Sequence, residues 1–148
     1  MRKDTAQHII ALFTRYAVPV SHVIIEITEE QAFSHSEASI QNLSLLRAAG
    51  FSIAIDDFGT GYANYERLKS LQASIIKIDG SFVKDIVTDS MDAMIVKSIC
   101  ELARVKNLSV VAEFVETEAQ RELLLRLGVE YLQGWLTGKP QPLADLQA

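Results

Sequence analysis

The sequence predicts an α/β fold, a partial (β/α)8 barrel of the TIM type with about five parallel strands and flanking helices. Three observations lead to this prediction. Five short apolar runs typical of strands alternate with helical patterns, and parallel strands need such crossover helices between them. Each predicted strand ends in charged or amide residues. With 148 residues, the chain is shorter than the roughly 250 residues of a typical eight-stranded barrel.

The predicted elements follow from local patterns. The strands cover residues 22–28, 51–57, 74–79, 108–115 and 130–136. Residues 1–18 are predicted to hold a leading helix that ends before Pro19, because apolar residues recur there at three- and four-residue spacing: Ile9, Leu12, Phe13 and Tyr16. A longer helix over residues 91–106 is expected to bury Met91, Met94, Ile95, Ile99 and Leu102.

Two further helices are predicted from their ends. Ser34 with Glu37, and Thr117 with Gln120, have the spacing of capping boxes, in which side chains satisfy the free N–H groups of a first helical turn. Glycine suits the left-handed position that closes a helix. We therefore expect these helices to end at Gly50 and Gly128.

The strand ends distinguish two parallel architectures. In a doubly wound open sheet the site gathers at one switch point, so outer strands need not contribute. In a barrel all strand ends face one mouth. Polar residues lie near the ends of all five strands, which favours the barrel: Glu26, Asp56, Asp57, Lys77, Asp79, Glu113 and Gln133. Because five strands cannot close, we expect residues 1–148 to be a truncated piece of a larger fold, with open edges that another chain or segment covers.

Composition excludes several partners. The net charge of −5 argues against a nucleic-acid polymer, because neutralising phosphates requires a basic surface. No stretch approaches the 18 or so apolar residues of a membrane span, and no signal peptide is recognised, which predicts a cytoplasmic segment without membrane contact. The single cysteine, Cys100, lies in an apolar helical run, so we expect a buried small hydrophobe rather than a catalytic thiol.

The strongest chemical signal is the run at residues 56–61, DDFGTG. Adjacent carboxylates at a strand end, followed by a glycine-rich turn, suit divalent cations, which take oxygen ligands and can share a bridging carboxylate. Taken alone, Asp56 and Asp57 could equally be helix caps in a solvated turn. Glu26 and Glu113 at other strand ends strengthen the metal hypothesis, since barrel strand ends converge.

Lys77 is the one cation among these carboxylates. It can position a nucleophilic water or neutralise charge that develops on a phosphoryl oxygen; the alternative is a structural salt bridge to Asp79 or to a neighbouring strand. A zinc site built on histidine ligands is not expected, because no histidine lies at the end of a predicted strand. The three histidines are His8, His22 and His35.

Five stretches together resemble the C-terminal part of an EAL-domain cyclic di-GMP phosphodiesterase. They are residues 25–29 (IEITE), 54–62 (AIDDFGTGY), 76–83 (IKIDGSFV), 110–117 (VVAEFVET) and 132–140 (LQGWLTGKP). The resemblance implies a (β/α)8 barrel that opens cyclic di-GMP to linear pGpG in bacterial second-messenger signalling, with two Mg²⁺ or Mn²⁺ ions. It also implies a homodimer or another oligomer.

The resemblance assigns roles residue by residue. It implies metal-binding roles for four carboxylates: Glu26, Asp56, Asp57 and Glu113. Lys77 resembles the lysine that holds the attacking water, and Glu113 also resembles a general base. Glu29 resembles the glutamate that pins the loop after the paired aspartates. Three further site positions match, with supporting roles toward substrate or loop: Asp79, Glu116 and Gln133.

Two departures from the family pattern bear on function. The Glu-Ala-Leu motif and the following metal-ligand asparagine do not occur here, and affinity for a hard cation follows ligand count. Phe114 stands where the family usually has glycine, so its ring either fills the neighbouring pocket or shifts the backbone, or else points away into the helix layer. We therefore expect negligible hydrolysis from these residues alone. The alternatives are a non-catalytic module, acting as cyclic di-GMP receptor or interaction platform, and a glycosidase with Glu26 and Glu113 as paired carboxylates; the paired aspartates and Lys77 argue against the glycosidase.

Overall fold

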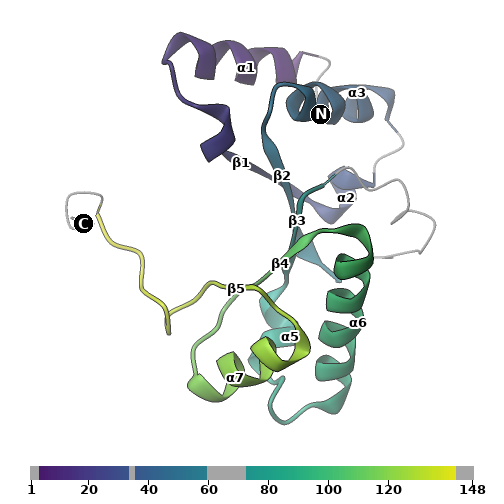
Figure 1. The fold of residues 1–148 in the computed structure, drawn as a ribbon, viewed down its shortest axis with the longest axis vertical. Helices are drawn as coiled ribbons and strands as arrows, with labels where there is room; N and C mark the ends of the chain where they lie inside the picture. The colour runs from purple at the N-terminus through teal and green to yellow at the C-terminus, as the bar shows by residue number, and fades with distance from the viewer. Residues whose placement is uncertain (1–3, 34–35, 60–72, 143–148) are drawn as a thin grey trace.

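The computed structural model describes residues 4–33, 36–59 and 73–142 (Figure 1). The strands form one parallel sheet in chain order, β1-β2-β3-β4-β5. Their bounds are Ile24–Thr28 (β1), Ser52–Phe58 (β2), Ile75–Ile78 (β3), Ser109–Ala112 (β4) and Tyr131–Leu132 (β5). The predicted α/β fold with five parallel strands is confirmed.

Helices follow the strands along the chain. In Figure 1, α1 and α3 lie together near the β1 end of the sheet, whereas α5, α6 and α7 gather at the β4 end. The bounds are Thr5–Arg15 (α1), Glu29–Ala32 (α2), Glu37–Ala48 (α3), Gly80–Lys84 (α5), Ser90–Lys106 (α6) and Glu118–Leu127 (α7), with a 3-10 turn, η1, at Val20–His22. Within the described ranges, no helix is both long and apolar enough to pass through a bilayer.

Strand register assigns the side chains to two faces of the sheet. Partners across the ladders include Glu26 with Ala54, Ala54 with Ile75, and Lys77 with Val111. Because side chains alternate along a strand, the even positions of β1 and β2 share a face with the odd positions of β3. Glu26, Asp56 and Lys77 therefore lie on one face of the sheet. The apolar side chains at the alternate positions of β2 and β3 lie on the other face.

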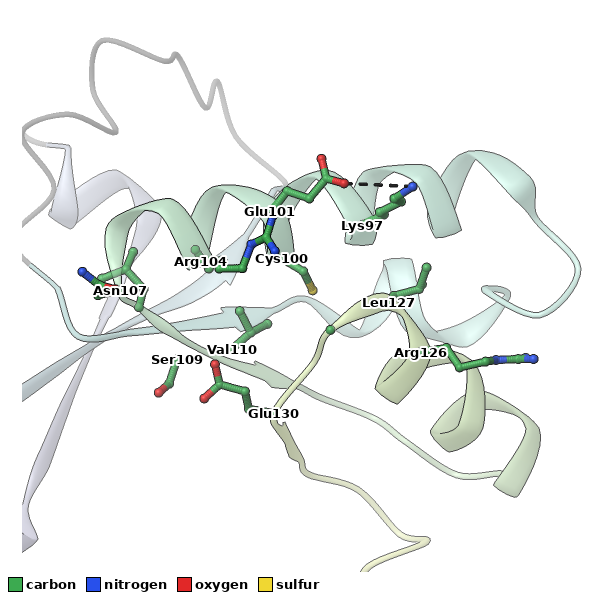
Figure 2. Close-up of a pocket in the computed structure, with 13 residues that line it drawn as sticks. Lys97, Cys100, Glu101, Arg104, Asn107, Ser109, Val110, Arg126, Leu127 and Glu130 are labelled. Atoms are coloured by element: carbon green, nitrogen blue, oxygen red, sulfur yellow. Dashed lines mark ion pairs between the residues drawn. The ribbon is translucent and has the colours of Figure 1, made fainter.

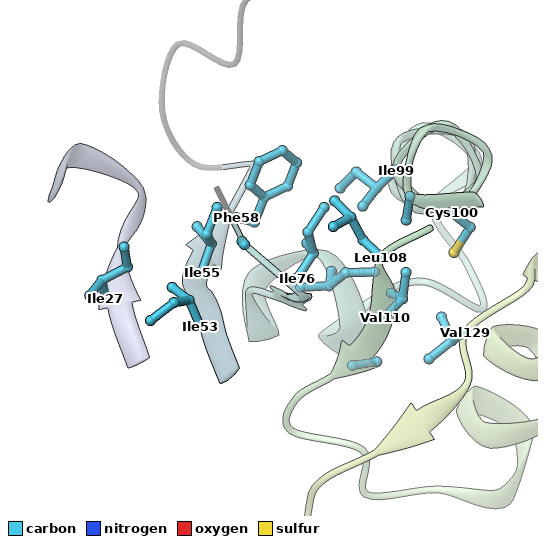
Figure 3. Packing of buried hydrophobic residues seen from close by; sticks show 14 of the residues in the cluster. Ile27, Ile53, Ile55, Phe58, Ile76, Ile99, Cys100, Leu108, Val110 and Val129 are labelled. Carbon is cyan, nitrogen blue, oxygen red and sulfur yellow. The ribbon is translucent and has the colours of Figure 1, made fainter. Parts of the chain in front are cut away.

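The hydrophobic core lies on that second face. Figure 3 shows Phe58 and Ile76 beside Ile99 of α6, whereas Ile53 lies on the side of Ile27 of β1. Ile53, Ile55 and Ile76 have no solvent exposure, and burying each such side chain stabilises the fold by about 2 kcal/mol. The members from α6 are Val96, Ile99, Cys100 and Ala103. This packing anchors the strands, so that the polar side chains of the opposite face have fixed positions.

β4 and β5 are shorter than predicted. β4 ends at Ala112, because Phe114 has a left-handed backbone (φ +54°) that breaks the extended conformation. β5 ends at Leu132, just before the backbone of Gly134 comes so close to Val115 that an added Cβ would lie 2.2 Å from the Val115 carbonyl oxygen. These departures lie where the polar side chains gather.

The buried face of α6 differs from the prediction. Met91 and Met94 are each 60% exposed, so their predicted burial is wrong. The buried residues, 96, 99, 100 and 103, form one stripe at helical spacing, and residues 91 and 94 point to the far side of a 3.6-residue helix. Ile99 is buried as predicted. Cys100 is also buried.

Helix ends agree with the sequence in part. Thr117 and Gln120 form the predicted capping box, and Gly128 closes α7 with φ +105°. α1 ends at Arg15, before Pro19, because Ala17 adopts a left-handed conformation. Ser34 lies outside the described residues. α3 instead begins after Ser36, at Glu37.

Candidate functional site

Lys77 is the centre of the polar face. Its ammonium Nζ lies 3.0 Å from Glu26 Oε2, 3.0 Å from Asp56 Oδ1 and 2.9 Å from Glu113 Oε1. These groups come from β1, β2, β3 and the residue that follows β4. Carboxylates from or next to three strands thus converge on the cation that a fourth strand supplies, as a barrel mouth requires.

The ammonium group is held in its charged form. Lys77 is only 5% exposed, and burial by itself lowers the pKa of a lysine. The carboxylates of Glu113, Glu26 and Asp56 outweigh this effect and raise the pKa of Lys77 above its ordinary value. Lys77 therefore remains protonated at neutral pH and neutralises part of the surrounding negative charge.

A second grouping lies beside the first. One carboxylate oxygen from each of Asp56, Asp57 and Glu113 falls within 4.8 Å of the others. Partial desolvation and the negative charges of Asp56 and Asp79 raise the pKa of Asp57, because charge accumulates there. A divalent cation would relieve this repulsion.

Asp56 supplies the test of whether these residues suit a metal. Its Oδ1 is buried and accepts no hydrogen bond with acceptable geometry, although the Lys77 ammonium lies at ion-pair distance, 3.0 Å. Buried polar oxygens normally have a hydrogen-bonded partner. A carboxylate oxygen has a second lone pair beyond the one that faces Lys77, and an all-oxygen donor set of this kind suits a hard divalent cation such as Mg²⁺, Mn²⁺ or Ca²⁺.

Glu29 supports the loop that follows the paired aspartates. It begins α2 directly after β1 and is 7% exposed. Its Oε2 accepts a hydrogen bond of 3.0 Å from the backbone N–H of Gly59. This bond joins the segment after β1 to the end of β2, so it positions the chain next to Asp57.

Asp79 has a structural role as well as a position near the site. It is the N-cap of α5, and its carboxylate accepts a 2.9 Å hydrogen bond from the Ser81 N–H. Hydrogen bonds from Ser81 lower its pKa, and a hydrogen bond with Asp57 acts in the same direction. Among the ion pairs found in the described residues, Lys77 contacts Glu26, Asp56 and Glu113 rather than Asp79.

Glu116 and Gln133 take no part in the ion pairs of Lys77 described above or in the grouping of Asp56, Asp57 and Glu113. They line a cavity of about 700 Å³ together with Phe114 and Trp135. Phe114 directly follows Glu113, so this cavity adjoins the cluster. Phe114 is 64% exposed; its ring lies against Gly80, the first residue of α5, and also borders this cavity. Sequence reasoning missed two residues at this cavity: Trp135, and Gly80, which contacts Phe114. The available signal was the single tryptophan of the chain, which lies between Gly134 and Gly138.

A second cavity, of about 610 Å³, lies at the opposite end of the strands (Figure 2). Its lining includes the C-terminal end of α6, the start of β4 and the end of α7. Figure 2 shows the charged side chains spread around this space instead of meeting at one point. The residues predicted to form the site do not line it.

The comparisons with known proteins agree with this geometry. The chain is 66% identical over 145 residues to the probable cyclic di-GMP phosphodiesterase PdeA of Escherichia coli K12, covering 98% of this chain and 20% of that protein. The solved PaMucR phosphodiesterase in complex with c-di-GMP is 45% identical, with a TM-score of 0.91 over 97% of this chain and 64% of that one. The chain thus spans about a fifth of the PdeA sequence.

A manganese and cyclic di-GMP complex of BlrP1 from Klebsiella pneumoniae is also similar, at 31% identity and a TM-score of 0.83 over 91% of this chain and 34% of that one. The EAL domain family matches residues 1–140. The chain therefore belongs to the EAL domain family.

Proposed function

We propose that this chain forms the carboxylate-bearing wall of a site that opens cyclic di-GMP to linear pGpG. The observation that carries the proposal is the convergence of three carboxylates on Lys77, each within 3.0 Å. Relatives named as cyclic di-GMP phosphodiesterases, and a solved relative in complex with c-di-GMP, support the choice of substrate.

We propose that four carboxylates hold divalent metal ions, Mg²⁺ or Mn²⁺: Glu26, Asp56, Asp57 and Glu113. Bound cations supply Lewis acidity and neutralise charge at the phosphoryl group. A solved relative that contains manganese and cyclic di-GMP supports this assignment.

The remaining roles belong to the side chains themselves. The Lys77 ammonium orients the attacking water and faces the charge that develops on a phosphoryl oxygen. Glu113, 8% exposed, accepts the proton of that water. Glu29 holds the loop that carries Gly59. Three residues contact substrate or support the loop: Asp79, Glu116 and Gln133.

We further propose that residues 1–148 alone hydrolyse cyclic di-GMP negligibly. Three of the four proposed metal-binding carboxylates lie within 4.8 Å of one another, and a pair of hard cations needs more oxygen ligands than these four side chains offer. The side chain of Glu26 is 50% exposed, so water weakens the field at the site. Turnover at a rate typical of enzymes, measured by chromatography of pGpG in Mn²⁺, would contradict this proposal.

A non-catalytic receptor or interaction platform is the second candidate. β1 and β5 each pair on one side only within the described sheet, and open strand edges favour pairing with other chains. We propose a homodimer or another oligomer on this ground, with a molar mass from light scattering as its test. Calorimetry with cyclic di-GMP, with and without Mn²⁺, separates a receptor from a platform that binds no nucleotide.

Metal binding is tested by titrating Mn²⁺ into the wild type and into Asp56→Asn. The amide keeps the size of the side chain but removes its charge, so we expect affinity to fall at least about tenfold. Glu101→Gln is the matched control, because its carboxylate lies on α6 and is 62% exposed. Equal Mn²⁺ affinity in Asp56→Asn and the wild type would overturn the metal assignment.

A further inference from the structure

Phe114 is held in an unfavourable conformation. Its φ of +54° lies in the left-handed region, which bulky residues rarely adopt and which carries a cost in backbone strain. The side chain is nevertheless 64% exposed, so hydrophobic burial of the ring offsets little of the backbone strain. A residue that is both strained and exposed calls for an explanation other than packing.

The surroundings of Phe114 leave part of its ring open. On one side it lies against Gly80, where an added Cβ would come within 2.3 Å of Phe114 Cδ2 and 2.7 Å of its Cγ. The absence of a side chain at Gly80 therefore gives the phenyl group its place. On the other side the group borders the cavity of about 700 Å³ that also contains Trp135.

We propose that Phe114 is a specificity-determining residue that stacks against a nucleobase of the bound nucleotide. This inference rests on the proposed function, because the cavity adjoins Glu113 of the carboxylate cluster. Metal ions held by the carboxylate cluster would bind a phosphate of the nucleotide. The base, joined to that phosphate through a sugar, would then lie in the adjoining cavity. Aromatic side chains suit bases because every base has a π-face.

Polar groups in the same cavity suit the edge of a base. Glu116 offers carboxylate oxygens as acceptors, and Gln133 offers an amide with both donors and acceptors. Trp135 is 61% exposed and is the single tryptophan of the chain. Its fluorescence therefore reports on this cavity without any label.

The test compares Phe114→Gly, Phe114→Leu and Phe114→Tyr in the full chain with Mn²⁺. Binding of cyclic di-GMP, GMP and the base-free ribose 5-phosphate is followed by calorimetry and by Trp135 fluorescence. We expect Phe114→Gly and Phe114→Leu to bind both guanine nucleotides about tenfold more weakly, while Phe114→Tyr keeps the wild-type affinity. Affinity for ribose 5-phosphate should not change in any variant.

Thermal unfolding of the same variants separates stacking from packing. Glycine adopts positive φ readily, so the midpoint of Phe114→Gly should equal or exceed that of the wild type. A lower midpoint with unchanged nucleotide affinity would show that Phe114 only packs on Gly80, and would overturn the inference.

The proposed function and the inference fail in different ways. If the wild type and Phe114→Gly bind cyclic di-GMP equally, the inference is overturned and the proposed substrate stands. If the wild type binds GMP through Phe114 but not cyclic di-GMP, the stacking role stands and the proposed substrate is wrong. If no base-containing ligand binds more tightly than ribose 5-phosphate, the inference is overturned.

Discussion

The two ends of the sheet contain similar kinds of residue in different arrangements. At the carboxyl ends of the strands, Lys77 lies within 3.0 Å of three carboxylates and is almost fully buried. Beside the opposite cavity, Lys97 and Glu101 are 4.0 Å apart and each side chain is 62% exposed. Charge content alone does not distinguish the two ends. What differs is that Lys77 and Glu113 are buried and in contact, so water screens this pair of charges less than it screens Lys97 and Glu101.

The largest expected effect contrasts the two lysines. Lys77→Met removes the cation from a buried cluster and leaves Glu113 without its partner, so we expect unfolding free energy to fall by about 3 kcal/mol. Lys97→Met removes an exposed i,i+4 partner and should cost less than about 0.5 kcal/mol. Urea denaturation of both variants measures the difference. Equal losses would show that the two ends are not electrostatically distinct.

A smaller effect is expected at the loop that borders the carboxylate cluster. Glu29→Ala removes the acceptor of the Gly59 N–H, which should cost about 1–2 kcal/mol and speed amide exchange at Gly59. Glu30→Ala is the matched control, because both glutamates lie in the first turn of α2 and Glu30 is exposed. Hydrogen exchange followed by NMR reads out the amide directly. Faster exchange in both variants would point to α2 as a whole instead of this bond.

The smallest effect on stability at neutral pH is expected from ionisation of Cys100, which lines the opposite cavity. Burial, with the charges of Glu130 and Glu101, raises its pKa to about 11 from 9.0. At pH 8 the native thiol should therefore alkylate about 100-fold more slowly than in urea. Because the folded pKa is raised, the thiol's contribution to stability is complete below pH 9 and is lost as pH rises toward 11. Rapid labelling by iodoacetamide at pH 8, seen by mass spectrometry, would contradict this burial.

The alternating pattern of strands and helices was enough to predict the parallel sheet, because apolar β-rich runs and capping signals are local. The sequence also allowed the convergence of the polar side chains to be predicted, since parallel strands place their carboxyl ends at one edge. These residues are Glu26, Asp56, Lys77 and Glu113. The register of the ladders then follows from burying the isoleucines. These properties depend on patterns that recur along the chain.

Features that depend on tertiary contacts were not predictable. The buried stripe of α6 depends on how the helix rotates against the sheet, so Met91 and Met94 were misplaced. Gln120 was predicted only as a cap, yet its amide also donates to the carbonyls of Val83 and Lys84 at 3.2 and 3.1 Å and so connects α7 to α5. The left-handed backbone at Phe114 likewise has no signature in its own side chain.

The ion pairs of Lys77 have a consequence for the order in which the protein assembles. Lys77 and Glu26 are separated by 51 residues along the chain, and Glu113 joins from a still later strand. A chain with only β1 and β2 paired would bring the carboxylates of Glu26 and Asp56 together without the Lys77 cation, so this partly folded form is penalised. The polar face therefore favours pairing of β3 with its neighbours over pairing of β1 and β2 alone.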